Sequence, residues 1–183
     1  MSTHLSTDTT TQILPPPDDT PTAPDHPAYL PHPGAYTASG DRCIVELSTF
    51  LGPLTTLRRR VTADEATLTV APSPDACVLA LTLTGDALGG DELSFVSTAI
   101  DPPANGSRLL VHGDLATADP TVPGVPATLR LRVVTRTDDS LLVIGTARVP
   151  CKDLRRTTGF ALSRIRPADQ LRLLVAAEFT CPA

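Results

Sequence analysis

The chain has 183 residues, of which 41% are hydrophobic and 19% charged, which is enough apolar material for one core. Its formal net charge of −5 gives no general attraction to nucleic acid phosphates or to anionic lipid surfaces, so no nucleic acid partner is expected. No stretch approaches the ~20 apolar residues of a membrane span. The N-terminus lacks the basic start and apolar run of a signal peptide, which predicts a cytoplasmic protein.

Aromatic residues are scarce in this chain, at 3% with no Trp, two Tyr and four Phe. The core must therefore consist mainly of Leu, Val, Ala and Thr. If these small side chains line a closed sheet of about eight strands, they leave room inside for a ligand. The alternative is a barrel or sandwich whose side chains pack it shut.

Residues 1–34 differ from the rest, because they hold eight of the 19 prolines and four Asp but no Lys or Arg. Prolines at this density favour an extended conformation without a packed core, and predict a disordered acidic tail. The alternative is a lid that docks on a barrel domain formed by residues 35–183. Its apolar anchors would be Ile13, Leu14, Tyr29 and Leu30.

The pattern from Tyr36 onward consists of short runs of β-branched and aliphatic residues separated by turn residues, which is typical of an all-β meander. The eight runs are Tyr36 to Ser48, Arg60 to Ala71, Cys77 to Thr84, Glu92 to Ile100, Arg108 to Ala116, Ala127 to Thr137, Ser140 to Val149, and Leu171 to Thr180. Hairpin connections make neighbouring strands antiparallel. The sequence therefore predicts an eight-stranded antiparallel barrel with a proline-rich N-terminal extension.

Two segments break this pattern, Leu51 to Leu57 and Cys151 to Thr158. We expect Pro150 to Thr157 to form a short helix or turn that closes one end of the barrel.

Alternation within the runs predicts one apolar face that points inward and lines the ligand site. The residues expected there are Leu79, Leu81, Leu83, Phe95, Leu109, Val111, Leu115, Leu129, Leu131, Val133, Leu173 and Val175. The opposite face carries charged residues that would lie in water. Among them are Arg130, Arg132, Arg148, Arg172 and Glu178.

Three stretches carry a resemblance to a known family. The first is Tyr36-Thr37 with Asp41 to Val45 and then Leu57 to Val61, the second is His112 to Thr117 with Pro126 to Leu131, and the third is Val149 to Phe160 with Leu171 to Phe179. Over about residues 36–180, their order resembles the YceI-like family of lipocalin-like barrels that bind polyisoprenoid chains. The resemblance implies an apolar isoprenoid ligand inside the barrel.

No catalytic residue can be assigned from a motif, and His112 and Glu46 are the candidates. His112 is the single histidine of residues 35–183, and without a paired Cys or Ser nucleophile it is more typical of a surface strand position. Glu46 is expected to be exposed. If it pointed inward, desolvation would raise its pKa and make it a candidate general acid and base.

Arginine and cysteine positions leave further alternatives open. Arg58 to Arg60 suit an oxyanion, or form a solvated rim that pairs with the acidic tail. The four cysteines have no zinc spacing and are expected to be free thiols, although Cys43 and Cys181 fall on the first and last strands, which would be neighbours in a closed barrel. With no metal or nucleotide motif, no cofactor is expected.

Two functions of different classes fit these observations. The first is a protein that binds an extended apolar ligand, an isoprenoid or a polyketide or polyene chain, inside the barrel. The second is a cofactor-free cyclase or pericyclase, of the [4+2] type, acting on a polyene or polyketide in natural-product biosynthesis with the N-terminal tail as lid. A closed barrel that serves as an interaction module is a third reading, and a homodimer is left open.

Overall fold

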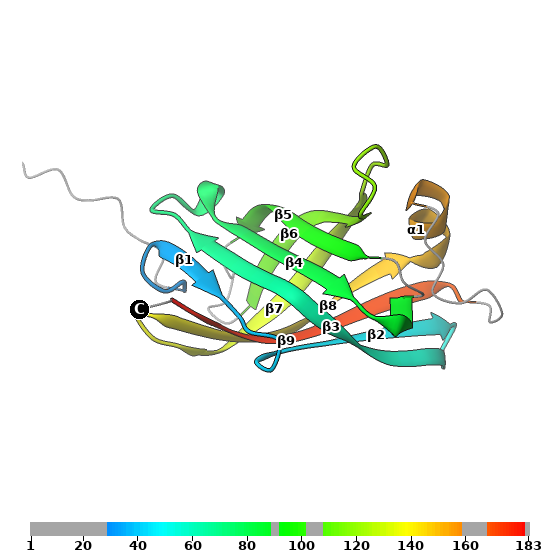
Figure 1. The fold of residues 1–183 in the computed structure, drawn as a ribbon, viewed down its shortest axis with the longest axis horizontal. Helices are drawn as coiled ribbons and strands as arrows, with labels where there is room; N and C mark the ends of the chain where they lie inside the picture. Colours follow the sequence, from blue (N-terminus) through cyan, green and yellow to red (C-terminus); the bar gives the residue numbers. More distant parts are fainter. Residues whose placement is uncertain (1–28, 89–91, 102–107, 159–167, 182–183) are drawn as a thin grey trace, which may run out of the picture.

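The computed structural model describes residues 29–88, 92–101, 108–158 and 168–181. These residues form β-strands with one α-helix and two short 3-10 helices (Figure 1). The strands are β1 (Gly34–Thr37), β2 (Cys43–Leu51), β3 (Leu54–Val70), β4 (Val78–Thr84), β5 (Leu93–Asp101), β6 (Arg108–Thr117), β7 (Val125–Arg136), β8 (Ser140–Pro150) and β9 (Gln170–Thr180). The helices are η1 (Pro74–Ala76), η2 (Asp86–Leu88) and α1 (Cys151–Thr158).

The sheet closes on itself. Its strands follow the order β3-β2-β9-β8-β7-β6-β5-β4, each antiparallel to its neighbour, and the pairing of β4 with β3 completes the ring. Closure gives each strand of the ring a neighbour on both sides, although β4 and β5 pair only over Ala80–Leu83 and Leu93–Val96. The predicted eight-stranded antiparallel barrel is therefore confirmed.

Strands β1 and β2 share one position in the ring. The short β1 pairs with residues 67–70 of β3, and β2 pairs with residues 54–62 of the same strand. Between β1 and β2 the chain turns, with the Ser39 hydroxyl donating a 2.6 Å hydrogen bond to the Asp41 carboxylate. The prediction of one continuous strand from Tyr36 to Ser48 was wrong, because these short polar side chains stabilise a turn instead.

The prediction that Leu51 to Leu57 breaks the strand pattern was also wrong. Strand β2 continues to Leu51, and β3 begins at Leu54 after a tight turn in which Gly52 has a φ of +55°. The tip of this hairpin is exposed to solvent, with Leu54 66% exposed. Because neither face is buried there, the sequence shows no alternation to mark the strands.

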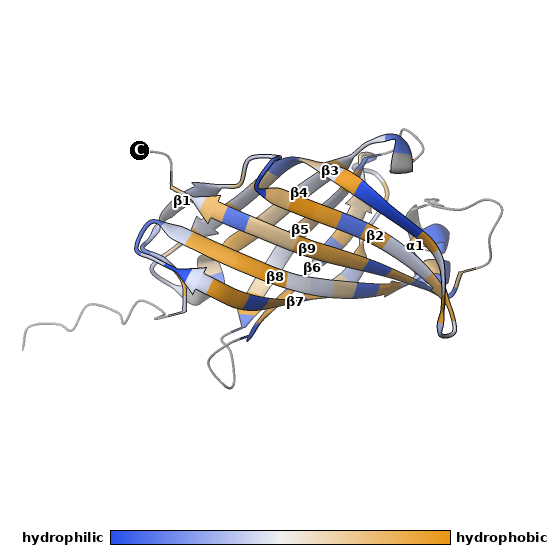
Figure 2. Ribbon diagram, turned by 90° about the horizontal axis from the view of Figure 1, so that it is seen from below, coloured by the Kyte–Doolittle hydropathy of each residue, from blue (hydrophilic) through white to orange (hydrophobic). Residues whose placement is uncertain are grey.

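The interior of the barrel contains the alternate, apolar residues of every strand, and orange and blue segments succeed one another along the ribbons of Figure 2. Eleven of the twelve residues predicted to face inward are buried, with exposed fractions from 0% to 3%. The twelfth, Val133, is half-buried beside a β-bulge in β7 that shifts the register. Alternation therefore identified the inner face correctly.

Gly113 allows an aromatic ring to enter the interior. A Cβ at this position would lie 2.8 Å from Cζ of Phe95 and closer still to the Val96 carbonyl oxygen. Phe95 is completely buried. Because Gly113 of β6 has no side chain, the ring of Phe95 on the neighbouring β5 has room in the interior.

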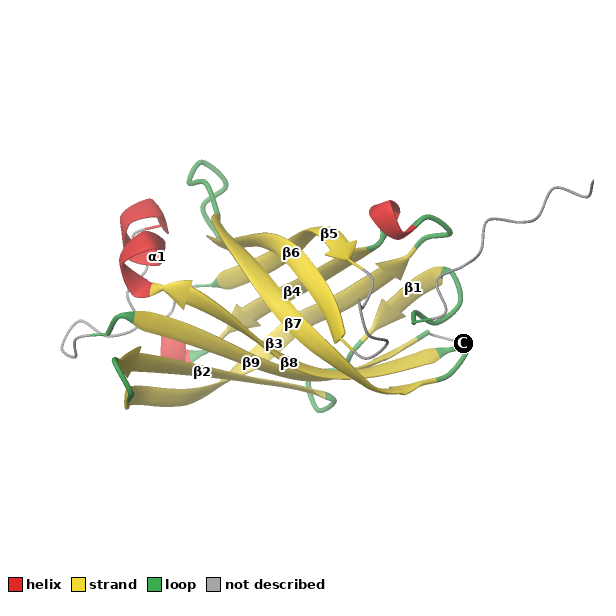
Figure 3. Ribbon diagram, turned by 180° about the vertical axis from the view of Figure 1, so that it is seen from behind, coloured by secondary structure: helices red, strands yellow, loops and turns green. Residues whose placement is uncertain are grey.

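The two ends of the barrel are different. Helix α1 lies at one end, and β1 lies with the end of β9 at the other (Figure 3). Leu154 anchors the helix, because its side chain is 2% exposed and belongs to the core. The predicted short helix before the last strand is confirmed.

Candidate ligand site inside the barrel

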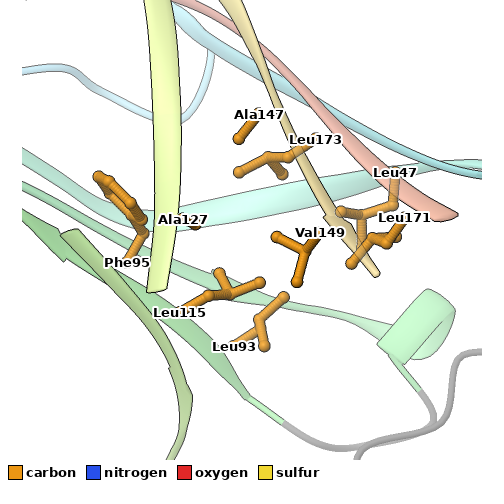
Figure 4. Close-up of a pocket in the computed structure, with 9 residues that line it drawn as sticks. All are labelled: Leu47, Leu93, Phe95, Leu115, Ala127, Ala147, Val149, Leu171 and Leu173. Atoms are coloured by element: carbon orange, nitrogen blue, oxygen red, sulfur yellow. The ribbon is translucent and has the colours of Figure 1, made fainter. Parts of the chain in front are cut away.

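A narrow gap lies in the half of the barrel nearest α1, since its lining includes the end of β8 and the start of β9. Figure 4 shows the residues that line it. Apolar side chains from strands β2, β5, β6, β7, β8 and β9 line it. They are Leu47, Leu93, Phe95, Leu115, Ala127, Ala147, Val149, Leu171 and Leu173. The space between these side chains is called the gap below. None of these described lining residues has a polar side chain, so they offer a ligand only apolar contacts.

The gap is not a preformed cavity. Its unfilled space amounts to about 260 Å³ including its open side, but none of that space accepts a water-sized sphere. This gap therefore does not show the roomy interior that was expected, and among the described residues that line it the structure fits the alternative in which side chains pack the space shut. The physical reason is that Leu and Phe95 fill the volume that small neighbours such as Ala127 and Ala147 leave.

Sequence reasoning found part of this site. Phe95, Leu115 and Leu173 were among the predicted ligand-contacting residues, and the other predicted residues lie elsewhere in the core. The six residues missed are Leu47, Leu93, Ala127, Ala147, Val149 and Leu171. The alternation of inward and outward residues along each strand could have found them. Ala127, for example, lies two positions before Leu129 and so shares its inward face.

The end of the barrel opposite α1 is covered by residues 29–33, called the strap below. Leu30 of the strap is 1% exposed and belongs to the core, and Tyr29 packs against it. Nη1 of Arg136 donates a 3.0 Å hydrogen bond to the Leu30 carbonyl oxygen. The Tyr36 hydroxyl donates a 2.6 Å bond to the carbonyl oxygen of His32. Two of the four expected lid residues thus contact the barrel, whereas Ile13 and Leu14 lie outside the described residues.

The strap crosses the mouth of the barrel. Burial raises the pKa of Tyr29, and the nearby Cys77, Asp101 and Asp75 raise it further, which places Tyr29 beside η1 and the end of β5. Arg136, which holds Leu30, lies at the end of β7. The strap and the gap are therefore at opposite ends, because the gap includes the early part of β7.

Glu46 points out of the barrel. Its Oε2 lies 2.7 Å from Nε of Arg58, and its Oε1 accepts a 3.2 Å hydrogen bond from Ser48. The bond from Arg58 lowers the pKa of this carboxyl below its usual value, and the charge of Arg172 adds to the effect. The condition for Glu46 to be an interior general acid, a raised pKa, is not met.

His112 also lies on the outer face, with 42% of its side chain exposed. Its Nε2 is 2.9 Å from Oδ2 of Asp101, and its Nδ1 shares a 3.1 Å hydrogen bond with Thr128. These contacts join three neighbouring strands on the outside of the barrel. Neither of the two candidate catalytic residues reaches the gap.

The four cysteines are free thiols in the structure. Cys43 is opposite Ala177 on β9, so Cys181 lies four positions further along the chain and does not pair with it. Burial raises the pKa of the Cys43 thiol. Among the described residues, no group of three or more His, Cys, Asp or Glu side chains could hold a metal ion.

Fold and site together define an eight-stranded antiparallel barrel with an apolar interior and a strap across one end. The crystal structure of BcnA from Burkholderia cenocepacia is similar, with a TM-score of 0.52 and 14% sequence identity over 77% of this chain and 98% of that one. At this identity the likeness shows a shared fold. The lipocalin-like barrel implied by the family resemblance is thus confirmed.

Two other comparisons bring no relative. No family model matches the chain, and no curated protein matches it. Membership of the YceI-like family therefore stays a prediction. Within the described part of the chain, no helix has the length and apolar character needed to cross a membrane.

Proposed function

We propose that this protein binds an extended apolar chain, an isoprenoid or a polyene or polyketide chain, in the half of the barrel nearest α1. The observation that carries the proposal is the gap, whose lining consists wholly of apolar side chains. A ligand with polar groups would lose its hydrogen bonds to water there and gain none in return. An apolar ligand has no such cost.

Binding requires the lining side chains to move, because the gap has no room for even a water molecule. Each buried CH₂ group of a ligand contributes about 0.8 kcal/mol, whereas displacing core side chains costs packing energy. The contribution grows with the length of the ligand. A long chain is therefore favoured over a small compact molecule.

The ligand enters at the α1 end in this proposal. The other end is closed by the strap, with Leu30 buried in the core. Of the α1 side chains that the structure describes, Leu154 alone is fully buried. Entry at this end requires the contacts of Leu154 and of the partly buried Cys151 with the core to open.

Native mass spectrometry of the purified protein tests the proposal directly, since a retained apolar mass identifies the ligand class. A variant test uses Ala147→Phe, which fills the gap, and Ala176→Phe, which places the same ring on the half-buried outer face of β9. We expect Ala147→Phe to abolish the binding of a fluorescent fatty acid probe and Ala176→Phe to retain it. Equal binding by both variants would place the ligand elsewhere.

A second candidate is a cofactor-free cyclase or pericyclase, of the [4+2] type, for a polyene or polyketide in natural-product biosynthesis. The observation in its favour is the strap, because covering an end of the barrel excludes water from a bound chain. The described residues that line the gap include no acid or base, so acceleration would come from holding the chain in a reactive fold. Cyclisation conserves the mass of the chain, so chromatography after incubation with a linear polyene distinguishes a cyclised product from a chain returned unchanged.

Location and assembly stay predictions in this proposal. We propose a cytoplasmic monomer or homodimer without a cofactor. Cell fractionation and analytical ultracentrifugation test these two points.

A further inference from the structure

Two arginines lie directly opposite each other on the outer face of the barrel. Arg148 of β8 and Arg172 of β9 are register partners, and both side chains point away from the core. Directly opposed residues of antiparallel strands have Cβ atoms about 5 Å apart, and like charges at that position are destabilising. No carboxylate of the described residues forms an ion pair with either of them. This pair is called the arginine pair below.

The guanidinium group of Arg172 packs against an aromatic ring. Its Cζ lies 5.0 Å from the centre of the Phe50 ring, which is the geometry of a cation–π contact. Its Nε is buried and makes no hydrogen bond within the described residues. A buried donor without an acceptor costs free energy. The arginine pair therefore combines a repelling charge with a guanidinium that packs against Phe50, and its remaining N–H groups are the ones that could meet an anion from solvent.

Glu46, whose carboxylate feels the charge of Arg172, is already engaged. Glu46 forms its ion pair with Arg58 at 2.7 Å, and Ser48, the register partner of Arg172, donates to its other oxygen. Arg58, Arg148 and Arg172 carry three positive charges against the one negative charge on Glu46, and Asp169, whose carboxylate accepts a 3.1 Å hydrogen bond from the backbone of Gly52, adds one negative charge at the edge of this face. The outer face at this point thus carries an excess of positive charge.

We propose that the arginine pair binds a phosphate group. Guanidinium forks match phosphate oxygens in geometry, and a phosphate dianion is attracted to an excess of positive charge more strongly than a single carboxylate. The phosphate could belong to a soluble anion or to a lipid headgroup, which share this chemistry.

The proposed site and the gap occupy opposite faces of the same strand segments. Val149, Leu171 and Leu173 line the gap, whereas Arg148 and Arg172 alternate with them and point outward. Figure 2 shows the strands that carry them, β8 and β9, side by side on the outside of the barrel. The sheet separates the two sites, so phosphate binding does not depend on the proposed apolar ligand.

The test compares thermal unfolding of the wild type, Arg148→Gln and Arg172→Gln in sodium phosphate and in sodium chloride of equal ionic strength. Arg132→Gln is the matched control, because Arg132 also lies opposite an arginine, Arg108, but has no contact with Phe50 or Glu46 among those the structure shows. In chloride we expect Arg148→Gln to unfold at the wild-type temperature or above, since it removes a repulsion. In phosphate we expect the order to reverse, because only proteins with the intact pair gain stability.

Isothermal titration with inorganic phosphate measures the same site. Losing one charged hydrogen-bond partner weakens binding by about tenfold to a hundredfold. The affinity of Arg148→Gln and of Arg172→Gln for phosphate should therefore fall by that factor, whereas the affinity of Arg132→Gln should not. Sedimentation with phosphatidic acid vesicles, against phosphatidylcholine vesicles, shows whether a lipid headgroup also occupies the site. No phosphate effect on the wild type, or an equal loss in Arg132→Gln, would overturn the proposal.

Discussion

Arg136 donates a 3.0 Å hydrogen bond through Nη1 to the backbone carbonyl oxygen of Leu30, which lies 106 residues earlier in the chain. The bond joins the end of β7 to the strap. With the buried Leu30 side chain, it makes the strap part of the folded barrel.

Replacing Leu30 by Ala should therefore destabilise the whole domain. Burial of the side chain is nearly complete, and Leu→Ala changes at such positions cost about 2–5 kcal/mol. The free energy of unfolding in urea measures the effect. Val134→Ala, at a position that is 47% exposed, is the control and should change stability little. An unchanged stability of Leu30→Ala would mean that the strap does not dock in solution.

Gly113→Ala should destabilise the barrel by overpacking its interior. The new methyl group would meet the Phe95 ring at 2.8 Å and the Val96 carbonyl oxygen at a shorter distance still, which corresponds to a cost of about 1–3 kcal/mol. Gly40→Ala is the matched control, because the nearest atom to its added Cβ is 3.5 Å away, an ordinary contact. Equal thermal stabilities for the two variants would contradict this packing.

Alkaline pH should destabilise the protein through Cys43. Burial raises the pKa of this thiol above its usual 9.0, so it stays protonated in the folded state while the unfolded chain ionises. The contribution of the protonated thiol to the free energy of unfolding is therefore complete below pH 9.0, and it is lost as the pH rises through the folded pKa.

Urea unfolding between about pH 7 and about pH 10 measures this slope. Tyr36, whose pKa burial raises above its usual 10.0, acts in the same direction. Cys43→Ala should flatten part of the slope, whereas Cys181→Ala, at an exposed position, should not. A slope that is identical in both variants would exclude Cys43 as its source.

Glu46→Gln and His112→Gln should leave the binding of an apolar probe unchanged. Both residues lie on the outer face, where Glu46 contacts Arg58 and His112 contacts Asp101 and Thr128. Fluorescence titration measures the probe affinity, and Ala147→Phe serves as the variant that loses it. A weaker affinity in either outer-face variant would show that the ligand does not sit in the gap.

Glu46 also predicts a response to acid. Its lowered pKa means that the ion pair with Arg58 stabilises the fold above the usual carboxyl pKa of 4.5 and is lost as the pH falls through the lower folded value. Because Arg58 is largely exposed, we expect the effect to be small. Thermal unfolding of the wild type and of Glu46→Gln across the acid range should converge at low pH. Profiles that stay apart at every pH would contradict the assignment.

The barrel could be predicted because alternation with a period of two is a local property of each strand. In β6, for example, Leu109, Val111 and Leu115 are all buried, and the intervening Leu110 is 37% exposed. Turn residues between the runs made the strands antiparallel, and the short helix with Leu154 followed from the break in alternation before the last strand. Each of these signals needs only neighbouring residues.

Tertiary structure decided the rest, because the remaining features depend on residues far apart in the chain. Whether the interior is open depends on volumes added across six strands, and Phe95 above Gly113 fills space that composition suggested would be empty. The docking of Leu30 depends on Arg136, and the lowered pKa of Glu46 depends on Arg58. The sequence by itself determined which face of each strand points inward, whereas register and closure decided what that face encloses.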